Sequence, residues 1–469
     1  MRNPIGIDYA CPRLSWNFSE GSKQSAYQIL ARDEDGDMLW DSGKVESQQM
    51  HLIPWGGANL KSRSEVFWKV TIWDEKDEAE TSDTAHFELG LLEKNDWSAE
   101  WITGDYVPKK KERYPVDCFK RSFVVKDGHK IKKARAYMSA CGLYEGRING
   151  KKIGDFILAP GITDYRKRIQ YQTVDVTDLL KEGDNELFFM LADGWYRGSV
   201  GAWGMRNYYG SETKLLAQIE ITYEDGEVAV IATDDTFSWT QDGPIRFADN
   251  KDGEIYDAGR EDFAKAVWKK AKVTSHKIWP TASNNFPLIE QERLMNPKLI
   301  VTPSGKKVLD FGQNIAGYVK LSVKGEKGAK CRMVCGEKLD TNGNFTVENI
   351  AWKANYDTCR FQSVDFVCDG VRHDYKPQFT IMGFRYVLLL DWPEDVDAGR
   401  FSAIAVYTDM DTTFSFTSSD AMLNRIVKNT FWSVKGNFMD VPTDCPTRER
   451  AGWTGDAQLF FNTGNYMMD

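Results

Sequence analysis

The sequence predicts a multidomain, mainly β protein that passes into helices near its C-terminal end, on three observations. The chain has 469 residues, a length that suits about three domains with a core each. Up to about residue 415, apolar and polar residues alternate along short runs bounded by Asp-Gly and Gly-Gly turns, which is typical of half-buried strands. Beyond that point the apolar residues follow the spacing of one helix face.

Residues 1–92 are expected to form one small β-sandwich. The runs 26–31 and 66–73 have the composition and length of sandwich strands, and turn-forming pairs separate them. Residues 92–96 are the expected linker to the next domain.

Residues 97–287 are expected to form a jelly roll. They contain further strand-like runs at 135–139, 170–176, 186–191 and 215–223, with Asn-Gly or Asp-Gly turns at 149, 225 and 242. Four residues after the third of these runs are candidates for carbohydrate contact: Asp193, Trp195, Tyr196 and Arg197. A buried structural turn is the alternative that we favour for them.

Residues 288–410 are expected to form a third β-sandwich, because alternation returns at 319–323 and 386–390. The motifs around Asp310 and Arg385 resemble binding sites, but we favour a structural interpretation. Gly312 and Gly383 would then supply turns, and Arg385 would form a buried pair.

Residues 411–469 are expected to be helical. Apolar residues at 423, 426, 427, 431, 434 and 438 share one helix face, and Ser418 or Ser419 is the expected N-cap. A second helix should begin near Thr454 and turn four residues toward a core: Ala457, Leu459, Phe460 and Phe461. Two helices cannot bury such faces alone, and each large apolar side chain left exposed forgoes about 1.5–3 kcal/mol.

The connecting loop between these helices, residues 443–456, concentrates groups that perform chemistry. Its carboxylates, Asp444, Glu449 and Asp456, are separated by Pro and Gly residues that turn the backbone. Carboxylates that converge push their pKa values apart, so that one can keep a proton and act as a general acid. Trp453 offers a flat apolar surface for a sugar ring. Paired acids of this kind are typical of glycoside hydrolysis.

Two features leave this interpretation open at the level of residue chemistry. Arg448 and Arg450 flank Glu449 and would favour its ionised form, so the acid role requires both arginines to pair elsewhere. A salt-bridged loop with Asp444 and Thr454 as helix caps is an equally good alternative.

The loop also carries a recognisable motif. The run Asp444-Cys-Pro-Thr-Arg-Glu-Arg-Ala-Gly-Trp-Thr-Gly-Asp456 closely resembles the catalytic-site signature of bacterial α-L-rhamnosidases, glycoside hydrolase family 78. The resemblance extends upstream through residues 377–386, 310–317 and 193–198, and it begins at residues 3–8 and 12–16. It covers essentially the whole chain.

The resemblance implies inverting hydrolysis of terminal non-reducing α-L-rhamnose from glycosides or glycans. It implies that Glu449 is the general acid and that a rhamnose subsite is lined by Asp444, Arg448, Trp453 and Asp456. The implied domains are a fibronectin type III-like sandwich, a carbohydrate-binding-like jelly roll, a β-sandwich and the first helices of an (α/α)6 catalytic barrel.

The family's general base lies downstream of the position that Asp469 matches. We therefore expect the chain to hold a truncated barrel and to be inactive by itself. The alternative function is that of a non-catalytic fragment whose β-domains bind carbohydrate.

Composition restricts the partners. The formal net charge is −9, which offers no basic field for nucleic acid, and no run of eighteen apolar residues predicts a membrane span. The expected partner is a rhamnosylated glycan or glycoside, and the oligomeric state is left open. The first residues lack the apolar stretch of a secretory signal, which favours the cytoplasm. A secreted or periplasmic location is the alternative if Met1 is an internal position of a longer chain.

No cofactor is expected. The eight cysteines show no paired framework and are expected to be reduced and mostly buried. Cys331 and Cys335 share a strand face, but no histidine accompanies them, so no metal site is predicted. The resemblance leaves room for a structural calcium ion in the jelly roll, although the sequence shows no acidic cage for it.

Overall fold

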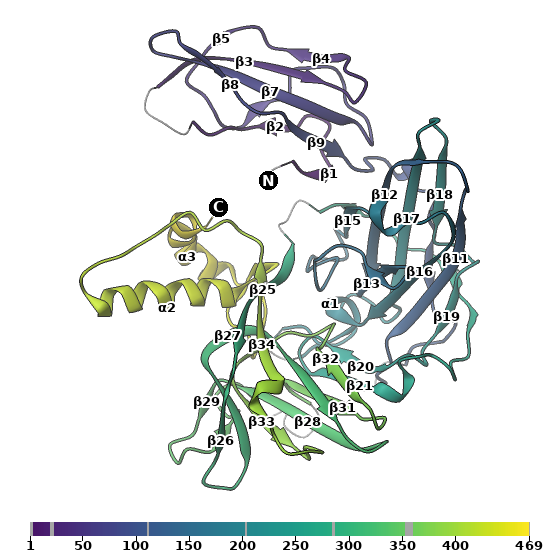
Figure 1. Ribbon diagram of the computed structural model, residues 1–469, viewed down its shortest axis with the longest axis vertical. Coiled ribbons are helices and arrows are strands. Elements are labelled where there is room, and N and C mark those ends of the chain that lie inside the picture. The colour runs from purple at the N-terminus through teal and green to yellow at the C-terminus, as the bar shows by residue number, and fades with distance from the viewer. Residues whose placement is uncertain are drawn as a thin grey trace.

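The computed structural model contains three β-domains in chain order, followed by two helices, the first of which lies against the third domain (Figure 1). It describes residues 3–18, 23–109, 112–201, 204–283, 287–351 and 360–468. Among these residues, no helix is both long enough and apolar enough to cross a membrane. The mainly β fold with a helical C-terminal region is therefore confirmed.

The first domain, purple in Figure 1, is centred on the strands β3 (Gln24–Arg32), β7 (Glu65–Asp74) and β9 (Ala85–Leu89). Alternate side chains of β3 and β7 are buried, as the period of a strand requires. The remaining strands are β1 (Ile5–Ile7), β2 (Arg13–Leu14), β4 (Met38–Asp41), β5 (Val45–Glu46), β6 (Ile53–Pro54) and β8 (Ala79–Thr81).

The second domain packs two mainly antiparallel sheets around a shared core. One sheet has the order β23-β10-β17-β12-β15-β24, with β18 paired to β17, and the other has the order β14-β13-β16-β11-β19-β22. The strands of the first sheet are β10 (Trp101–Thr103), β12 (Ile131–Cys141), β15 (Gln170–Asp175), β17 (Lys214–Tyr223), β18 (Val228–Ala232), β23 (Lys272–Thr274) and β24 (Thr281–Ala282). Those of the second are β11 (Asp117–Val125), β13 (Leu143–Ile148), β14 (Lys151–Lys152), β16 (Gly183–Ala192), β19 (Ser238–Thr240) and β22 (Lys269–Lys270).

The third domain is a ten-stranded sheet of order β20-β21-β31-β28-β33-β27-β34-β25, with β26 and β32 paired to β27. Its strands are β20 (Ile245–Asp249), β21 (Gly253–Asp257), β25 (Leu288–Met295), β26 (Lys298–Val301), β27 (Lys307–Lys324), β28 (Lys330–Gly336), β31 (Ser363–Val367), β32 (Arg372–Tyr375), β33 (Met382–Leu390) and β34 (Phe401–Thr408). A short pair, β29 (Lys338–Leu339) and β30 (Phe345–Thr346), lies beside it. The first two strands come from the range expected for the jelly roll and join this sheet through the parallel pairing of β21 with β31.

Short 3₁₀ turns connect several of these elements. They are η1 (Lys94–Asp96), η2 (Thr177–Leu179), η3 (Ala258–Arg260) and η5 (Ala398–Arg400). The first of them, η1, lies in the predicted linker. Arg63 of the first domain pairs with Asp96 of this turn and, through Nη2 at 2.6 Å from Oε1, with Glu220 of β17. Ion pairs of this kind fix the first domain against the second.

The helical segment consists of α2 (Ala421–Asn437), the hairpin β35 (Phe438–Met439) and β36 (Val441–Pro442), and α3 (Thr454–Met467). Asp420 caps α2 by accepting hydrogen bonds from the backbone N–H groups of Met422 and Leu423. The expected serine caps are therefore wrong, because Ser418 instead binds the backbone of Asp420. The start of α3 at Thr454 is confirmed.

Candidate active site

The connecting loop (443–456) is closed at its base by backbone contacts. Thr443 and Gly452 form an isolated bridge, and the Asp444 N–H donates to the Ala451 carbonyl at 3.1 Å. The Asp444 carboxylate accepts a hydrogen bond from the Ala451 N–H at 3.1 Å. Asp444 therefore helps to close the loop, and residues 445–450 are held as an arch between its two ends.

Glu449 lies on this arch with both carboxylate oxygens engaged. The Trp453 indole N–H donates to Oε2 at 2.9 Å, and Arg448 Nη2 donates to Oε1 at 3.2 Å. The Glu449 N–H contacts Cys445 Sγ at 3.3 Å. Only 14 % of the Glu449 side chain is exposed, whereas Trp453 is 45 % exposed. Glu449 is thus an oriented, half-buried carboxyl group at a solvent-facing surface.

Arg450, the next residue, points the opposite way into the protein and is 6 % exposed. Its guanidinium donates to the carbonyls of Asn250 and Ile381, to Gln362 Oε1 at 2.9 Å and to the Thr447 carbonyl at 3.1 Å. Burial lowers the pKa of Arg450 to about 10. A backbone φ of 52° at Arg450 produces this change of direction.

These contacts meet the condition for the acid role at Arg450 but not at Arg448, and the role of Glu449 stays a prediction. Arg450 pairs with the third domain and leaves Glu449, as the acid role requires. Arg448 does contact the Glu449 carboxylate, but through one hydrogen bond rather than a bidentate clasp. The alternative of a purely structural loop therefore fits Arg450 and Asp444, whereas Glu449, Arg448 and Trp453 form a separate outward-facing cluster.

Gly383 explains how the loop sits so close to the sheet. A Cβ atom at Gly383 would lie 2.4 Å from Thr447 Cγ2 and 2.9 Å from Pro446 Cγ. Gly383 lies within β33 and its φ is not positive, so the expected turn at this residue is wrong. Glycine is needed here because the connecting loop leaves no room for a side chain.

The neighbouring motif residues are structural, as expected. Arg385 Nε and Nη2 donate to the two oxygens of Asp310 at 2.7 and 2.8 Å, and this pair lowers the pKa of Asp310. The Arg385 side chain is 39 % exposed, so the pair is at the surface rather than buried. Gly312 has a φ of 74° but lies within β27, where the pairing with β33 is irregular between Asp310 and Ile315, so it marks a bulge in the strand rather than the expected turn.

The last predicted subsite residue, Asp456, lies in the first turn of α3 and is exposed. Among the described residues, no hydrogen bond joins it to Glu449, Arg448 or Trp453. The apolar faces beside it are also uncovered: Leu459 is 82 % exposed and Phe461 50 %. The expectation that Leu459 and Phe461 turn toward a core is wrong in this structure. Phe460, which lies between them in the chain, does pack, against Phe438.

The four jelly-roll candidates for carbohydrate contact are buried. Asp193, Trp195, Tyr196 and Arg197 are at most 5 % exposed, in and just before the short helix α1 (Gly194–Arg197). Arg197 Nη2 and Arg206 Nη2 both bind the Asp193 carboxylate, at 2.7 and 3.0 Å. Their burial fits the favoured structural turn better than a contact with sugar.

The structure adds residues that sequence reasoning missed. Asn250, Ile381 and Gln362 position the loop by accepting hydrogen bonds from Arg450. The first two do so through backbone carbonyls, which every residue type has, and Gln362 through its side-chain amide oxygen, so no sequence signal marks them. A cavity of about 1350 Å³ lies between the first two domains and the start of the helical segment. Glu449 does not line it, so chemistry and not cavity size identifies the candidate site.

The described cysteines are free thiols, as expected. Burial raises the pKa of Cys331 and of Cys335 to about 12 each, and Cys331 interacts with Cys368 rather than with Cys335. Cys359 lies outside the described residues.

Four sequence models of protein families match the chain. They are described as the Rha78A-like N-terminal immunoglobulin domain (residues 1–93), the α-L-rhamnosidase N-terminal domain (129–302), the bacterial α-L-rhamnosidase concanavalin-like domain (300–407) and the bacterial α-L-rhamnosidase 6 hairpin glycosidase domain (411–469). The connecting loop belongs to the last of these matches.

Individual proteins that the chain resembles are also α-L-rhamnosidases. An α-L-rhamnosidase of Formosa agariphila is 34 % identical over the whole chain, which covers 53 % of that protein. The crystal structure of Aspergillus terreus α-L-rhamnosidase matches with a TM-score of 0.92 and 33 % identity, over the whole chain and 55 % of that structure. Streptomyces avermitilis α-L-rhamnosidase complexed with L-rhamnose matches with a TM-score of 0.91 and 27 % identity, over the whole chain and 62 % of that structure.

The chain thus spans little more than half the length of the curated relatives it matches. It matches them through three β-domains and the beginning of the glycosidase domain. The chain belongs to the bacterial α-L-rhamnosidases of glycoside hydrolase family 78.

Proposed function

We propose that this chain contributes to the inverting hydrolysis of terminal non-reducing α-L-rhamnose in glycosides or glycans, with Glu449 as the general acid. The observation that carries the proposal is the orientation of Glu449. Its carboxylate accepts the indole N–H of the exposed Trp453, while Arg450 donates to the third domain. No cofactor is required, because proton transfer and water attack suffice for this reaction.

The proposed subsite consists of Asp444, Arg448, Trp453 and Asp456. The exposed Trp453 ring would pack on the apolar face of a sugar. Arg448 donates one hydrogen bond to Glu449 at 3.2 Å. A rhamnose hydroxyl that takes Arg448 as its donor would release Glu449 from this contact, and exclusion of water around the sugar would then favour the protonated acid.

The general base is not assigned to a residue of this chain. An inverting glycosidase needs a second carboxylate about 6.5–9.5 Å from the acid, with room for a water molecule between them. The open setting of the loop, with Trp453 and the α3 face exposed, gives little exclusion of water. We therefore expect residues 1–469 by themselves to give no turnover.

Hydrolysis of an aryl α-L-rhamnoside tests both parts of the proposal. A polypeptide that adds the remainder of a hairpin glycosidase domain, as in the relatives, should release L-rhamnose with β configuration as the first product in an NMR time course. Glu449→Gln should abolish turnover. Activity in the Glu449→Gln variant, or a first product of α configuration, contradicts the assignment.

A separate assay distinguishes binding from catalysis. Saturation-transfer NMR with L-rhamnose on the 469-residue chain should show contact that weakens in Trp453→Ala. Hydrolysis by the 469-residue chain, lost in Glu449→Gln, would contradict the expected inactivity while supporting the role of the acid. The alternative of a non-catalytic carbohydrate-binding fragment loses support because its four candidate residues are buried.

A further inference from the structure

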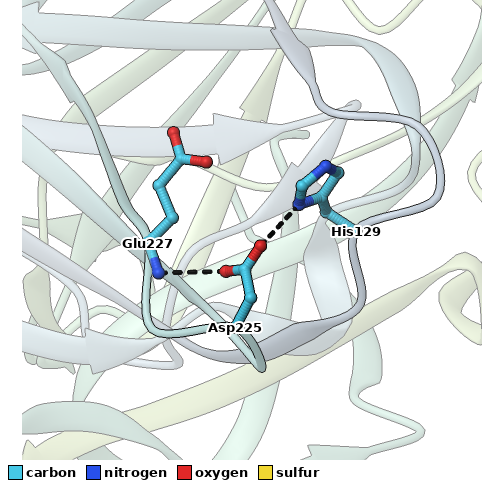
Figure 2. Close-up of side chains that lie close together, drawn as sticks. All are labelled: His129, Asp225 and Glu227. Carbon is cyan, nitrogen blue, oxygen red and sulfur yellow. Dashed lines mark hydrogen bonds and ion pairs between the residues drawn. The ribbon is translucent and has the colours of Figure 1, made fainter.

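One group of side chains outside the candidate active site has the composition of a metal site. His129, Asp225 and Glu227 offer a ring nitrogen and two carboxylate oxygens that lie within 4.8 Å of one another. His129 lies in the loop between β11 and β12, and Asp225 and Glu227 lie in the neighbouring turn between β17 and β18 (Figure 2). We propose that these three residues bind a divalent transition metal ion such as Zn²⁺.

The donor set determines the class of metal. Zinc accepts histidine nitrogen and carboxylate oxygen at about 2.0–2.2 Å, so its ligands lie about 3–4 Å from one another. The donors here need to approach by about 1 Å, which rotation of the long Glu227 side chain supplies. A nitrogen and two carboxylates suit Zn²⁺, whereas Ca²⁺ requires six to eight oxygen ligands. Water would complete the coordination.

The backbone beneath the site is ordered by the sheet. Ile131 of β12 pairs with Tyr223 of β17, and the Glu224 N–H donates to the Lys130 carbonyl at 2.9 Å just beyond this pair. The Tyr223 N–H closes the turn by donating to the Glu227 carbonyl at 2.9 Å. The loop that carries His129 and the hairpin turn that carries Asp225 and Glu227 are thus held together before any ion binds, which reduces the entropy lost on binding.

Hydrogen bonds and ring packing also orient the Asp225 and His129 side chains. Asp225 Oδ1 accepts the Glu227 N–H at 3.0 Å, so Oδ2 is directed toward His129 Nδ1 at 2.9 Å. The His129 ring packs edge-on against Tyr223, with centroids 5.8 Å apart. The Glu227 N–H lowers the pKa of Asp225. Partners of this kind fix the orientation and charge of metal ligands.

Lys126 supplies a competing charge. Its ammonium group pairs with Glu227, and Lys130 pairs likewise with Glu224. A metal ion that takes Glu227 must displace the Lys126 ammonium. This competition distinguishes the proposed site from a general attraction of cations to an acidic turn, because removal of Lys126 should increase the affinity.

Isothermal titration of the 469-residue chain with ZnCl₂ tests the proposal. One site should be seen, weakened about tenfold or more in His129→Ala and in Asp225→Asn, and strengthened in Lys126→Met. The controls His51→Ala and Cys11→Ser remove other exposed Zn²⁺ donors and should leave this site unchanged. Equal affinity in wild type and His129→Ala, or no binding by the wild type, overturns the proposal.

Asp225→Asn guards against effects of misfolding, because asparagine keeps the shape and the acceptor for the Glu227 N–H. Its thermal unfolding without metal should match that of the wild type. The ¹⁵N resonance of His129 Nδ1 should shift on addition of Zn²⁺ to the wild type. A resonance that does not move while Zn²⁺ binds places the ion elsewhere and overturns the assignment.

Discussion

Replacement of Arg450 by methionine should detach the connecting loop from the third domain. The guanidinium donates four hydrogen bonds to buried acceptors, and a hydrogen bond from a charged group contributes about 1.5–3 kcal/mol. The lower figure gives a loss of about 6 kcal/mol. Burial of the cation offsets part of it, because it lowers the pKa of Arg450 to about 10, a penalty of about 3 kcal/mol at 1.36 kcal/mol per pKa unit.

Arg450→Met should therefore weaken the attachment of the connecting loop to the third sheet by about 3 kcal/mol. Opening of the loop should become about a hundredfold more frequent or more, since 1.4 kcal/mol is a factor of ten. Native-state hydrogen exchange measures this at the N–H groups of Asp444 and Ala451, which bond across the loop. Their protection should fall while that of Phe119 in β11 stays constant.

A matched control is Arg332→Met, which removes a partly exposed pair with Asp365 on the third sheet. This variant should leave exchange in the connecting loop unchanged. If Arg450→Met alters the protection of Asp444 and Ala451 by less than about threefold, the hydrogen bonds of Arg450 do not hold the connecting loop. Arg450 then does not set the orientation of Glu449.

Three further predictions follow from particular contacts. Gly383→Ala should lower the free energy of unfolding in urea by about 1–3 kcal/mol, because its Cβ would lie 2.4 Å from Thr447 Cγ2; Thr447→Ser in the same chain should restore part of the loss, and no restoration would show that the contact is not the cause. Burial raises the pKa of Glu254 to about 7 from 4.5, so between these pH values the folded protein keeps a proton on Glu254 that the unfolded chain has lost. The free energy of unfolding should therefore decline by about 3 kcal/mol as the pH rises from 4.5 through 7. Glu254→Gln should remove this decline in unfolding measured from pH 5 to 8, and an unchanged slope would assign it to other groups. Leu459→Ser should change the stability by less than about 0.5 kcal/mol, because the side chain is 82 % exposed, and it should reduce any self-association seen by light scattering; a large loss of stability would mean that this face is covered.

The alternation of the strands and the period of α2 were readable because each reports how one element is half-buried. The cap of α2 was not, since Ser418, Ser419 and Asp420 are all suitable residues and only the backbone path decides which one accepts the N–H groups. Leu459 shows the opposite limit. Its helical spacing correctly indicates a helix, but periodicity cannot tell whether a partner covers that face.

The sequence by itself determined the family, the order of the β-domains and helices, and the loop in which Glu449, Arg448 and Trp453 occur, because these follow from local pattern and a long motif. Only the tertiary structure decided that Arg450 turns away from Glu449 to donate to Asn250, Ile381 and Gln362. It also decided that His129 meets Asp225 and Glu227. Such contacts join residues far apart in the chain, and which backbone carbonyl or side chain a group reaches depends on how separate sheets pack, which no local pattern encodes.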